Sequence, residues 1–275
     1  MDIGIIGLGL IGGSLGLSLK NRDWNGRIYG YDINNSYLNK AISLNIIDEK
    51  KEKLEDLVNT VSVVVIAVPV SRIAELIKNV AAINSKVIIT DVGSVKDSII
   101  KEIDSNINYI PAHPIAGTEN SGPEAAIKDL FSEKRIILCK KSKIIEEMWT
   151  FTGGKIEFMD SKKHDTIFAA VSHLPHLIAY SIVDSIVELE EQNDAFFKYI
   201  ASGFKDFTRI ASSDPIMWSD VFIENRENLL FVLDYFKKSI EKLENKIKSH
   251  DKENLKNILK EVKMVRDSAI KEMKK

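Results

Sequence analysis

Over its first 160 residues the chain alternates short apolar runs with longer amphipathic stretches, and this alternation constrains the fold most strongly. The apolar runs are of strand length and rich in Val, Ile or Tyr. Those predicted as strands are Asp2–Ile6, Arg27–Tyr31, Val63–Val68, Lys86–Asp91, Asn106–Ile110, Lys134–Cys139 and Lys155–Met159. The predicted helices between them are Gly12–Asn21, Ser36–Leu44, Ser71–Ile83 and Ser94–Ile103. Such a pattern is typical of a mostly parallel sheet with helices on both faces.

After residue 160 the pattern changes, because apolar residues then recur at intervals of three and four and no strand signal remains. We therefore predict an α/β domain over residues 1–160 and an all-helical domain over residues 161–275. The last stretch is dense in Lys and Glu, which is typical of a solvated helix face, or of a helix whose opposite face packs on another subunit.

The composition excludes several classes of protein. The net charge of −2 gives no basic excess for binding nucleic acid. No apolar run approaches the roughly 18 residues of a membrane helix, and the N-terminus lacks the pattern of a secretory leader. The single cysteine, Cys139, excludes an internal disulfide. We expect a cytoplasmic globular protein without nucleic-acid or membrane partners.

A glycine-rich turn near the N-terminus predicts a dinucleotide site. The stretch IGIIGLGLIGGSLGLSL begins as a strand and ends as a helix, and Gly7, Gly9 and Gly12 give GxGxxG between them. The three glycines allow the tight turn, the approach of a pyrophosphate and the packing of helix on strand, in that order. The pyrophosphate would meet the free N–H groups of Leu10 and Ile11 at the helix N-terminus. The alternative is a glycine turn that serves packing alone.

Asp32 predicts which dinucleotide binds. It ends the second predicted strand, 20 residues beyond Gly12, where a carboxylate can accept hydrogen bonds from both ribose hydroxyls. It would repel a 2′-phosphate, and residues 33–35 offer no Arg to bind one, so NAD is favoured over NADP. Val68 and Pro69 follow a buried strand and would border the adenosine or the nicotinamide ribose, although a proline there is equally a strand terminator.

Polar residues also follow two later predicted strands, at the sheet edge where ligands bind in α/β proteins. These residues are Asp91, Ser94, Lys96, His113, Thr118 and Glu119. Alone, Ser94 would be a helix N-cap. Beside a cofactor that accepts hydride, however, the imidazole of His113 would take the proton of a substrate hydroxyl. We place His113 on a loop, where Pro111 and Pro114 restrict the backbone and preorganise the ring.

The helical part carries a second polar cluster. The stretch VSHLPHLIA places His173 and His176 on one side of a helix that we expect Pro175 to interrupt. We predict no metal site, because no third ligand stands at a familiar spacing.

Further along, GFKDFTRIASSDPIMWSD carries Asp206, Arg209 and Trp218. An arginine in an otherwise apolar helix needs an anion, and its guanidinium fits a carboxylate. The sequence therefore predicts a site for an acidic small molecule between the two domains.

Taken together, these motifs resemble the prephenate dehydrogenase family, which includes arogenate and cyclohexadienyl dehydrogenases. The stretches that carry the resemblance are GLGLIGGSL, AVPV, DVGSVK, PAHPIAGTENSG, HDTIFAAVSHLPHLIA and GFKDFTRIASSDPIMWSD, in this order along the chain. The resemblance implies a Rossmann-type domain followed by an all-helical dimerisation domain, and hence a homodimer. It implies the NAD-dependent oxidative decarboxylation of prephenate to 4-hydroxyphenylpyruvate, CO₂ and NADH, a step toward tyrosine.

The resemblance also implies roles for individual residues. His113 would be the catalytic histidine, Ser94 would position the substrate hydroxyl near the nicotinamide, and Arg209 would bind a substrate carboxylate. His176 would line the same pocket, with Asp206 able to orient it. The remaining pocket residues would be Thr118, Glu119, His173 and Trp218.

Other functions stay open at this point. Arogenate differs from prephenate by an ammonium in place of a ketone, and no residue can be assigned to read that difference. A β-hydroxyacid-type dehydrogenase would use a lysine in a long helix of the second domain, whereas this helix carries SHLPH. A non-catalytic NAD-binding sensor would need no base beside the nicotinamide. We expect no fused chorismate mutase domain and no complete regulatory ACT domain.

Overall fold

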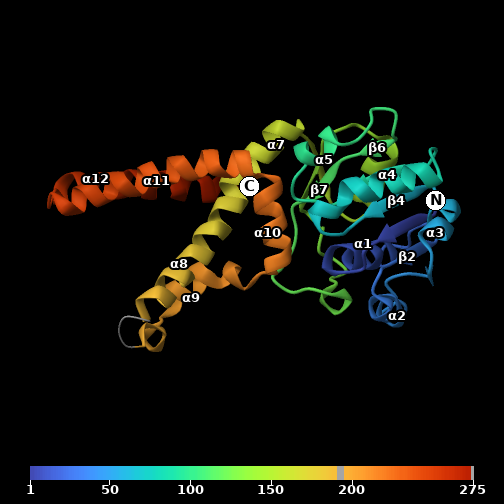
Figure 1. The fold of residues 1–275 in the computed structure, drawn as a ribbon, viewed down its shortest axis with the longest axis horizontal. Helices are drawn as coiled ribbons and strands as arrows, with labels where there is room; N and C mark the ends of the chain where they lie inside the picture. The colour runs from blue at the N-terminus through green and yellow to red at the C-terminus, as the bar shows by residue number, and fades with distance from the viewer. Residues whose placement is uncertain (191–194, 274–275) are drawn as a thin grey trace. The chain divides into compact units, whose positions relative to one another are not determined.

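Six parallel strands form the central sheet of the computed structural model, in the order β3-β2-β1-β4-β5-β6 (Figure 1). The structure describes residues 1–190 and 195–273. The strands of this sheet are β1 (Ile3–Ile6), β2 (Ile28–Tyr31), β3 (Glu49–Lys50), β4 (Val63–Ile66), β5 (Ile88–Asp91) and β6 (Tyr109–Ile110). Ile6 pairs with both Tyr31 and Ile66, and Ile66 pairs with Asp91. Four strands therefore end at one level, and the residues that follow them lie along one edge.

A second, three-stranded sheet holds β7 (Ala112–Pro114), β8 (Arg135–Leu138) and β9 (Lys155–Phe158). The last two strands were predicted, but as members of the main sheet. The loop predicted around His113 is wrong, because His113 is the middle residue of β7 and pairs with Ile137. Pro111 and Pro114 hold the backbone at φ values that also suit a short edge strand.

The main sheet is covered on both faces, as predicted. Alternate residues of β4 point to opposite sides, so Val63 and Val65 belong to one core and Val64 and Ile66 to the other. The first core is closed by α1 (Leu10–Lys20), α2 (Asn35–Ser43) and α6 (Lys143–Phe151), and the second by α3 (Leu54–Thr60), α4 (Ile73–Ile83) and α5 (Asp97–Lys101).

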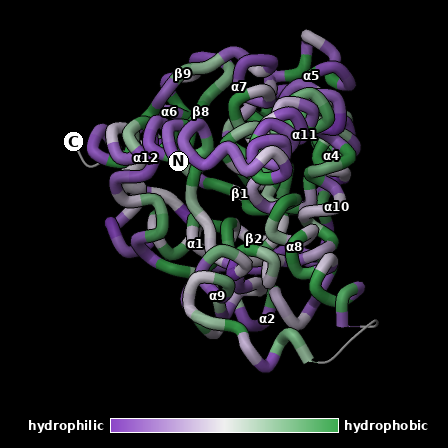
Figure 2. Tube along the Cα trace, turned by 90° about the vertical axis from the view of Figure 1, so that its left-hand side faces the viewer, coloured by the Kyte–Doolittle hydropathy of each residue, from purple (hydrophilic) through white to green (hydrophobic). Residues whose placement is uncertain are grey.

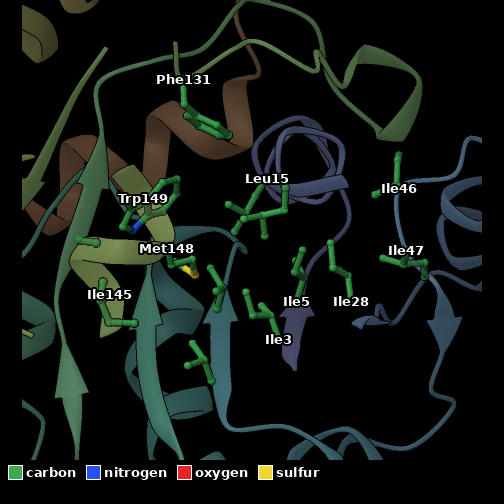
Figure 3. Close-up of a cluster of buried hydrophobic side chains, with 14 of the residues drawn as sticks. Ile3, Ile5, Leu15, Ile28, Ile46, Ile47, Phe131, Ile145, Met148 and Trp149 are labelled. Atoms are coloured by element: carbon green, nitrogen blue, oxygen red, sulfur yellow. The ribbon is translucent and has the colours of Figure 1, made fainter. Parts of the chain in front are cut away.

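Side chains of the first core are drawn in Figure 3, where Leu15 of α1 and Met148 of α6 lie beside Ile3 and Ile5 of β1. Figure 2 shows β1 in the hydrophobic colour, whereas hydrophilic residues dominate α12 (Lys252–Met273). A strand buried on both faces needs such continuous apolar character.

Beyond β9 the described residues form helices and turns, as predicted. The helix α7 (Ser161–Phe168) passes through a π-helical turn (Ala169–His173) into α8 (Leu174–Glu190) without a break. The predicted interruption at Pro175 is wrong. The wide turn just before Pro175 accommodates the missing N–H, a common way for helices to absorb such a defect. The later helices are α9 (Ser202–Thr208), α10 (Pro215–Glu224), α11 (Arg226–Lys248) and α12.

The continuous helix Ser161–Glu190 is long and apolar enough, by length and composition, to cross a membrane. The expectation that no such run exists is wrong, since residues 166–183 contain no Asp, Glu, Lys or Arg. Only 17% of its most apolar window is buried within the single chain. Length and composition alone are weak evidence, because helices of soluble proteins pass the same test. This helix therefore exposes an apolar surface, but it is not thereby a membrane span.

The chain forms two compact units, Met1–Asn228 and Leu229–Lys275. The second unit contains most of α11 and all of α12, with ion pairs one turn apart on their surfaces, as between Asp234 and Lys238. The start of α7 at Ser161, capped by the Asp160 carboxylate, lies at the predicted domain boundary. The functional division at residue 160 stays a prediction.

Candidate active site

The turn between β1 and α1 has the geometry of a phosphate-binding loop. Gly7 has φ +90°, and a Cβ there would lie 2.3 Å from the Ala67 carbonyl oxygen. A Cβ on Gly12 would lie 2.0 Å from the Gly7 oxygen. The protein itself thus requires both glycines. A Cβ on Gly9, in contrast, would meet no atom within 4 Å, so the backbone there faces open space at the N-terminus of α1.

Asp32 lies beside this turn, directly after β2. Its Oδ2 accepts a hydrogen bond from the Leu8 N–H at 2.8 Å, and its Oδ1 accepts one from the Asn34 N–H at 2.8 Å. Two backbone donors thus orient the carboxylate next to the glycine turn. Val68 also borders the turn, since its Cγ1 would be 3.0 Å from a Cβ on Gly7. Pro69 then leads into a 3-10 turn.

Asp91 and Lys96 are fully buried and form an ion pair with each other. The Asp91 carboxylate also accepts hydrogen bonds from the Tyr109 hydroxyl at 2.8 Å and the Gly93 N–H at 2.8 Å. Lys96 donates a second hydrogen bond to the Ala112 carbonyl, next to His113, at 2.9 Å. These two charges therefore connect the ends of β5, β6 and β7 through hydrogen bonds, and they are not open to a ligand.

Ser94 is half-buried and lies in the loop between Asp91 and Lys96. The alternative considered for Ser94, a helix N-cap, is wrong, because α5 begins three residues later, at Asp97. The carboxylate of Asp165, from α7, takes the capping role instead: it accepts the N–H groups of Lys96 at 2.9 Å and Asp97 at 2.8 Å. The Ser94 hydroxyl is thus not consumed in capping a helix.

His113 is joined to two residues of α7 that carried no predicted role. Its Nδ1 lies 2.8 Å from Nε2 of His164, and Nδ1 of His164 lies 2.7 Å from Oδ1 of Asp165. The ring of Phe168 packs edge-on against His113 with centroids 5.0 Å apart. The only signal in the sequence is the pair His164-Asp165 one turn after the helix start at Ser161. Neither periodicity nor spacing distinguishes that pair from a solvated helix end.

The two linked imidazoles are held neutral. Burial lowers the pKa of His113 well below its ordinary value, and the nearby His164 and Lys96 lower it further. Burial also lowers the pKa of His164, against the opposing effect of its hydrogen bond to Asp165. At neutral pH His113 therefore carries a free lone pair, which is the state a general base requires.

His176 stacks on Trp218, with ring centroids 3.6 Å apart. Its Nδ1–H donates to the Ser172 carbonyl at 2.9 Å, one turn earlier in the helix. Asp206 is exposed, and no hydrogen bond joins it to His176 in the described part of the chain, so its orienting role stays a prediction. Burial lowers the pKa of His176 as well.

His173 is buried next to this pair, and its Nδ1 lies 3.1 Å from Nδ2 of Asn225. The same Asn225 amide donates to the main-chain carbonyl of Asp165 at 2.8 Å, so it links the two histidine clusters. Burial lowers the pKa of His173 to about 4. Nε2 of His173 and Nε1 of Trp218 are buried and have no hydrogen-bond partner within the described structure. Buried polar atoms of this kind call for an explanation, such as a bound polar group.

The sequence predicted that Arg209 lies in an otherwise apolar helix. In the structure it lies instead in an exposed 3-10 turn. Its Nη1 is 3.2 Å from the Glu119 carboxylate, with side chains 59% and 38% exposed. Thr118, also exposed, accepts the N–H of Asn120 at 3.3 Å. The guanidinium is therefore reachable from solvent, and Glu119 holds the place that a carboxylate ligand would take.

The strand order 3-2-1-4-5-6 and the glycine turn after β1 define a dinucleotide-binding α/β protein. Comparison with known families gives the finer class. Residues 15–157 match the family profile described as "Prephenate dehydrogenase, nucleotide-binding domain", and residues 160–261 match "Prephenate dehydrogenase, dimerization domain". The chain belongs to the prephenate dehydrogenase family.

Individual relatives agree over nearly the whole chain. Cyclohexadienyl dehydrogenase of Zymomonas mobilis is 36% identical, over 96% of this chain and 94% of that protein. Prephenate dehydrogenase of Bacillus subtilis is 32% identical, over 96% and 74%. The solved structure of prephenate dehydrogenase from Aquifex aeolicus, in complex with hydroxyphenyl propionate and NAD⁺, superposes with a TM-score of 0.90 at 38% identity, over 97% of each chain. These matches confirm the predicted family and fold class.

Proposed function

We propose that this protein catalyses the NAD-dependent oxidative decarboxylation of prephenate to 4-hydroxyphenylpyruvate. The observation that carries the proposal is His113, held neutral and partly buried beside the strand ends. Its similarity to the Aquifex aeolicus enzyme, whose structure contains NAD⁺ and hydroxyphenyl propionate, supports the choice of substrate. Prephenate has a ring hydroxyl opposite a ring carboxylate, so the loss of hydride and CO₂ leaves an aromatic ring, and the proton that the base takes from the hydroxyl returns to the phenolate oxygen.

The residues of the glycine turn fit NAD. The open space at Gly9 admits a pyrophosphate against the backbone, and the N-terminus of α1 supplies N–H donors and a favourable dipole. Asp32 is oriented to accept the ribose hydroxyls. The residues proposed to hold the cofactor are Gly7, Gly9, Leu10, Ile11, Gly12, Asp32, Val68, Pro69 and Ser94. When bound, NAD supplies the acceptor for the hydride.

The remaining residues of the site are proposed either to position the substrate or to transfer its proton. His113 takes the proton of the ring hydroxyl, and Ser94 orients that hydroxyl. Arg209 binds a carboxylate of the substrate, for which Glu119 must give way. The other residues proposed to line the pocket are Thr118, His173, His176 and Trp218. The unpartnered nitrogens of His173 and Trp218 offer two further donor positions there, because an indole N–H only donates and Nδ1 of His173 accepts from the Asn225 amide.

We also propose that residues 161–275 act as the substrate and dimerisation domain of a cytoplasmic homodimer. The family profile for this part is described as a dimerization domain. Large apolar side chains lie exposed along its helices in the single chain, and they include Val171, Ile216, Ile223, Leu230, Val262 and Val265. A soluble protein rarely leaves so much apolar surface uncovered.

Arogenate is the second candidate substrate, because it shares the reacting ring and differs only in the side chain. A solved arogenate dehydrogenase from Synechocystis superposes with a TM-score of 0.78 at 25% identity, over 98% of this chain and 99% of that one. The same groups would perform the same ring chemistry on it.

The test is the formation of NADH from purified protein with prephenate or arogenate and NAD or NADP, in each pairing. Turnover with prephenate and NAD supports the proposal, whereas turnover with arogenate alone corrects the substrate. His113→Asn should abolish turnover and leave NAD binding nearly intact. No turnover in any pairing, with normal NAD affinity, would instead favour an NAD-binding sensor.

A further inference from the structure

His113, His164 and Asp165 form a chain of two hydrogen bonds that runs from β7 into α7. The distances are 2.8 Å between the two rings and 2.7 Å from the second ring to the carboxylate. His164 is completely buried and Asp165 nearly so. An imidazole has two nitrogens, and in the neutral ring one donates and the other accepts. The direction of each hydrogen bond in the chain therefore determines which nitrogen of His113 is free.

The direction is fixed at the Asp165 end. Besides His164, this carboxylate accepts the N–H of Lys96 on Oδ1 at 2.9 Å and the N–H of Asp97 on Oδ2 at 2.8 Å. A main-chain N–H can only donate, and both oxygens are occupied as acceptors. The carboxylate is thus held in its ionised form, and Nδ1 of His164 must carry the proton that it donates to Asp165.

The same reasoning passes the direction on to His113. Burial lowers the pKa of His164, so the ring is neutral and its Nε2 has only a lone pair. Nδ1 of His113 must then donate to that lone pair. Because His113 is itself neutral, its remaining nitrogen, Nε2, carries no proton.

We propose that His164 and Asp165 are positioning residues that fix the tautomer of His113, so that its Nε2 is the atom that takes the substrate proton. This inference rests on the proposed function. The O–H bond of the substrate breaks, its electron pair forms the C=O bond as the hydride passes to the bound NAD, and the proton bonds to Nε2. The resulting imidazolium keeps its Nδ1–H donated to His164, and charge-assisted hydrogen bonds toward the ionised Asp165 stabilise it. The opposite tautomer would present an N–H to the substrate hydroxyl and could accept nothing.

The test variant is Asp165→Asn. The Oδ1 position must still accept the N–H of Lys96 and the Nδ1–H of His164, so the amide oxygen takes that position and the direction of the hydrogen bonds is kept. Asparagine carries no negative charge, however, so the imidazolium of His113 loses the charge that stabilises it. We expect kcat for prephenate to fall roughly 10²- to 10⁴-fold, with little change in KM or in NAD affinity. A kcat equal to that of the wild type would overturn the proposal.

A direct measurement of the tautomer separates this inference from the proposed function. In protein labelled with ¹⁵N-histidine, NMR distinguishes protonated from unprotonated ring nitrogens, and His113→Asn assigns the signals of that ring. We expect Nδ1–H and a bare Nε2 in the wild type. A wild-type His113 with its proton on Nε2 refutes the inference even if prephenate turns over. If prephenate does not turn over, the NMR result still decides it.

A second pair of variants covers the case in which Asp165→Asn does not fold. His164→Phe keeps a ring of similar size but removes both nitrogens, whereas the side-chain oxygen of His164→Gln can still accept from Nδ1 of His113. We expect kcat to be lower in His164→Phe than in His164→Gln, with similar KM values. Equal rates in the two variants would contradict the proposal. Lys163→Ala is the matched control, since this exposed residue of α7 makes no side-chain hydrogen bond or ion pair with the described residues.

Discussion

The glycine turn allows a change that harms cofactor binding without harming the fold. Gly9 has φ −74°, which alanine adopts without strain, and the added methyl group would meet no protein atom within 4 Å. We therefore expect Gly9→Ala to fold normally. At this N-cap position, replacing glycine by alanine should lower the free energy of unfolding by no more than about 1 kcal/mol.

The cofactor, in contrast, should bind much more weakly to Gly9→Ala. The methyl group would stand where the pyrophosphate approaches the backbone, and hydrogen bonds to a charged group contribute about 1.5–3 kcal/mol. Because about 1.4 kcal/mol corresponds to a factor of ten, the Kd for NAD should rise roughly 10- to 150-fold. Isothermal titration with NAD measures the affinity, and thermal unfolding without NAD measures the stability.

Two other glycines complete the experiment. Gly203→Ala, in α9, also places its methyl group in open space and should leave the Kd for NAD unchanged. Gly12→Ala would bring a Cβ to 2.0 Å from the Gly7 oxygen and should lower the unfolding temperature even without cofactor. An unchanged Kd in Gly9→Ala would refute the placement of the pyrophosphate over this turn.

Three further predictions concern single side chains. Asp32→Ala should weaken NAD binding and narrow the difference in kcat/KM between NAD and NADP; an unaltered cofactor preference would remove Asp32 from the ribose site. Arg209→Gln should raise KM for prephenate roughly 10- to 150-fold, as expected for the loss of a charged hydrogen bond, and an unchanged KM would show that Arg209 does not bind the carboxylate. His173 should make the protein sensitive to acid. Its pKa is about 4 in the folded state and about 6.5 in the unfolded state, so the unfolded state binds the proton first, and stability is lost as the pH falls from 6.5 toward 4. The loss should reach about 3 kcal/mol, seen in urea unfolding as a steeper pH dependence than in His173→Gln; parallel curves for the two proteins would contradict it.

Much of the nucleotide-binding half could be predicted, because its signals are local. A strand buried on both faces, as β4 is, reads as an unbroken apolar run, and Gly12 is required by the carbonyl oxygen of Gly7, five residues earlier. Asp32 could be predicted for the same reason, since it directly ends β2. Periodicity also identified the helical half.

The hydrogen-bonded chain of His113, His164 and Asp165 could not be predicted, because it depends on contacts between residues far apart in the sequence. His164 is 51 residues from His113, and Asp165 is 69 residues from Lys96. The strand β7 could not be predicted for a similar reason. Such a short strand beside prolines is recognisable only once its partner β8 is known. The N-cap considered as an alternative for Ser94 is wrong for the same reason, because the distant carboxylate of Asp165 caps the helix instead.

The π-helical turn Ala169–His173 determines the directions in which the side chains of α8 point relative to those of α7. Each residue of an α-helix advances the side-chain direction by about 100°, so a turn that holds one extra residue rotates α8 by about that angle relative to α7. His164 and His176, which contact His113 and Trp218, lie on opposite sides of this turn along the helix. A deletion of one residue within this turn would leave the composition and hydropathy of the helix almost unchanged. It would nevertheless turn His176 away from Trp218 while His164 kept its place.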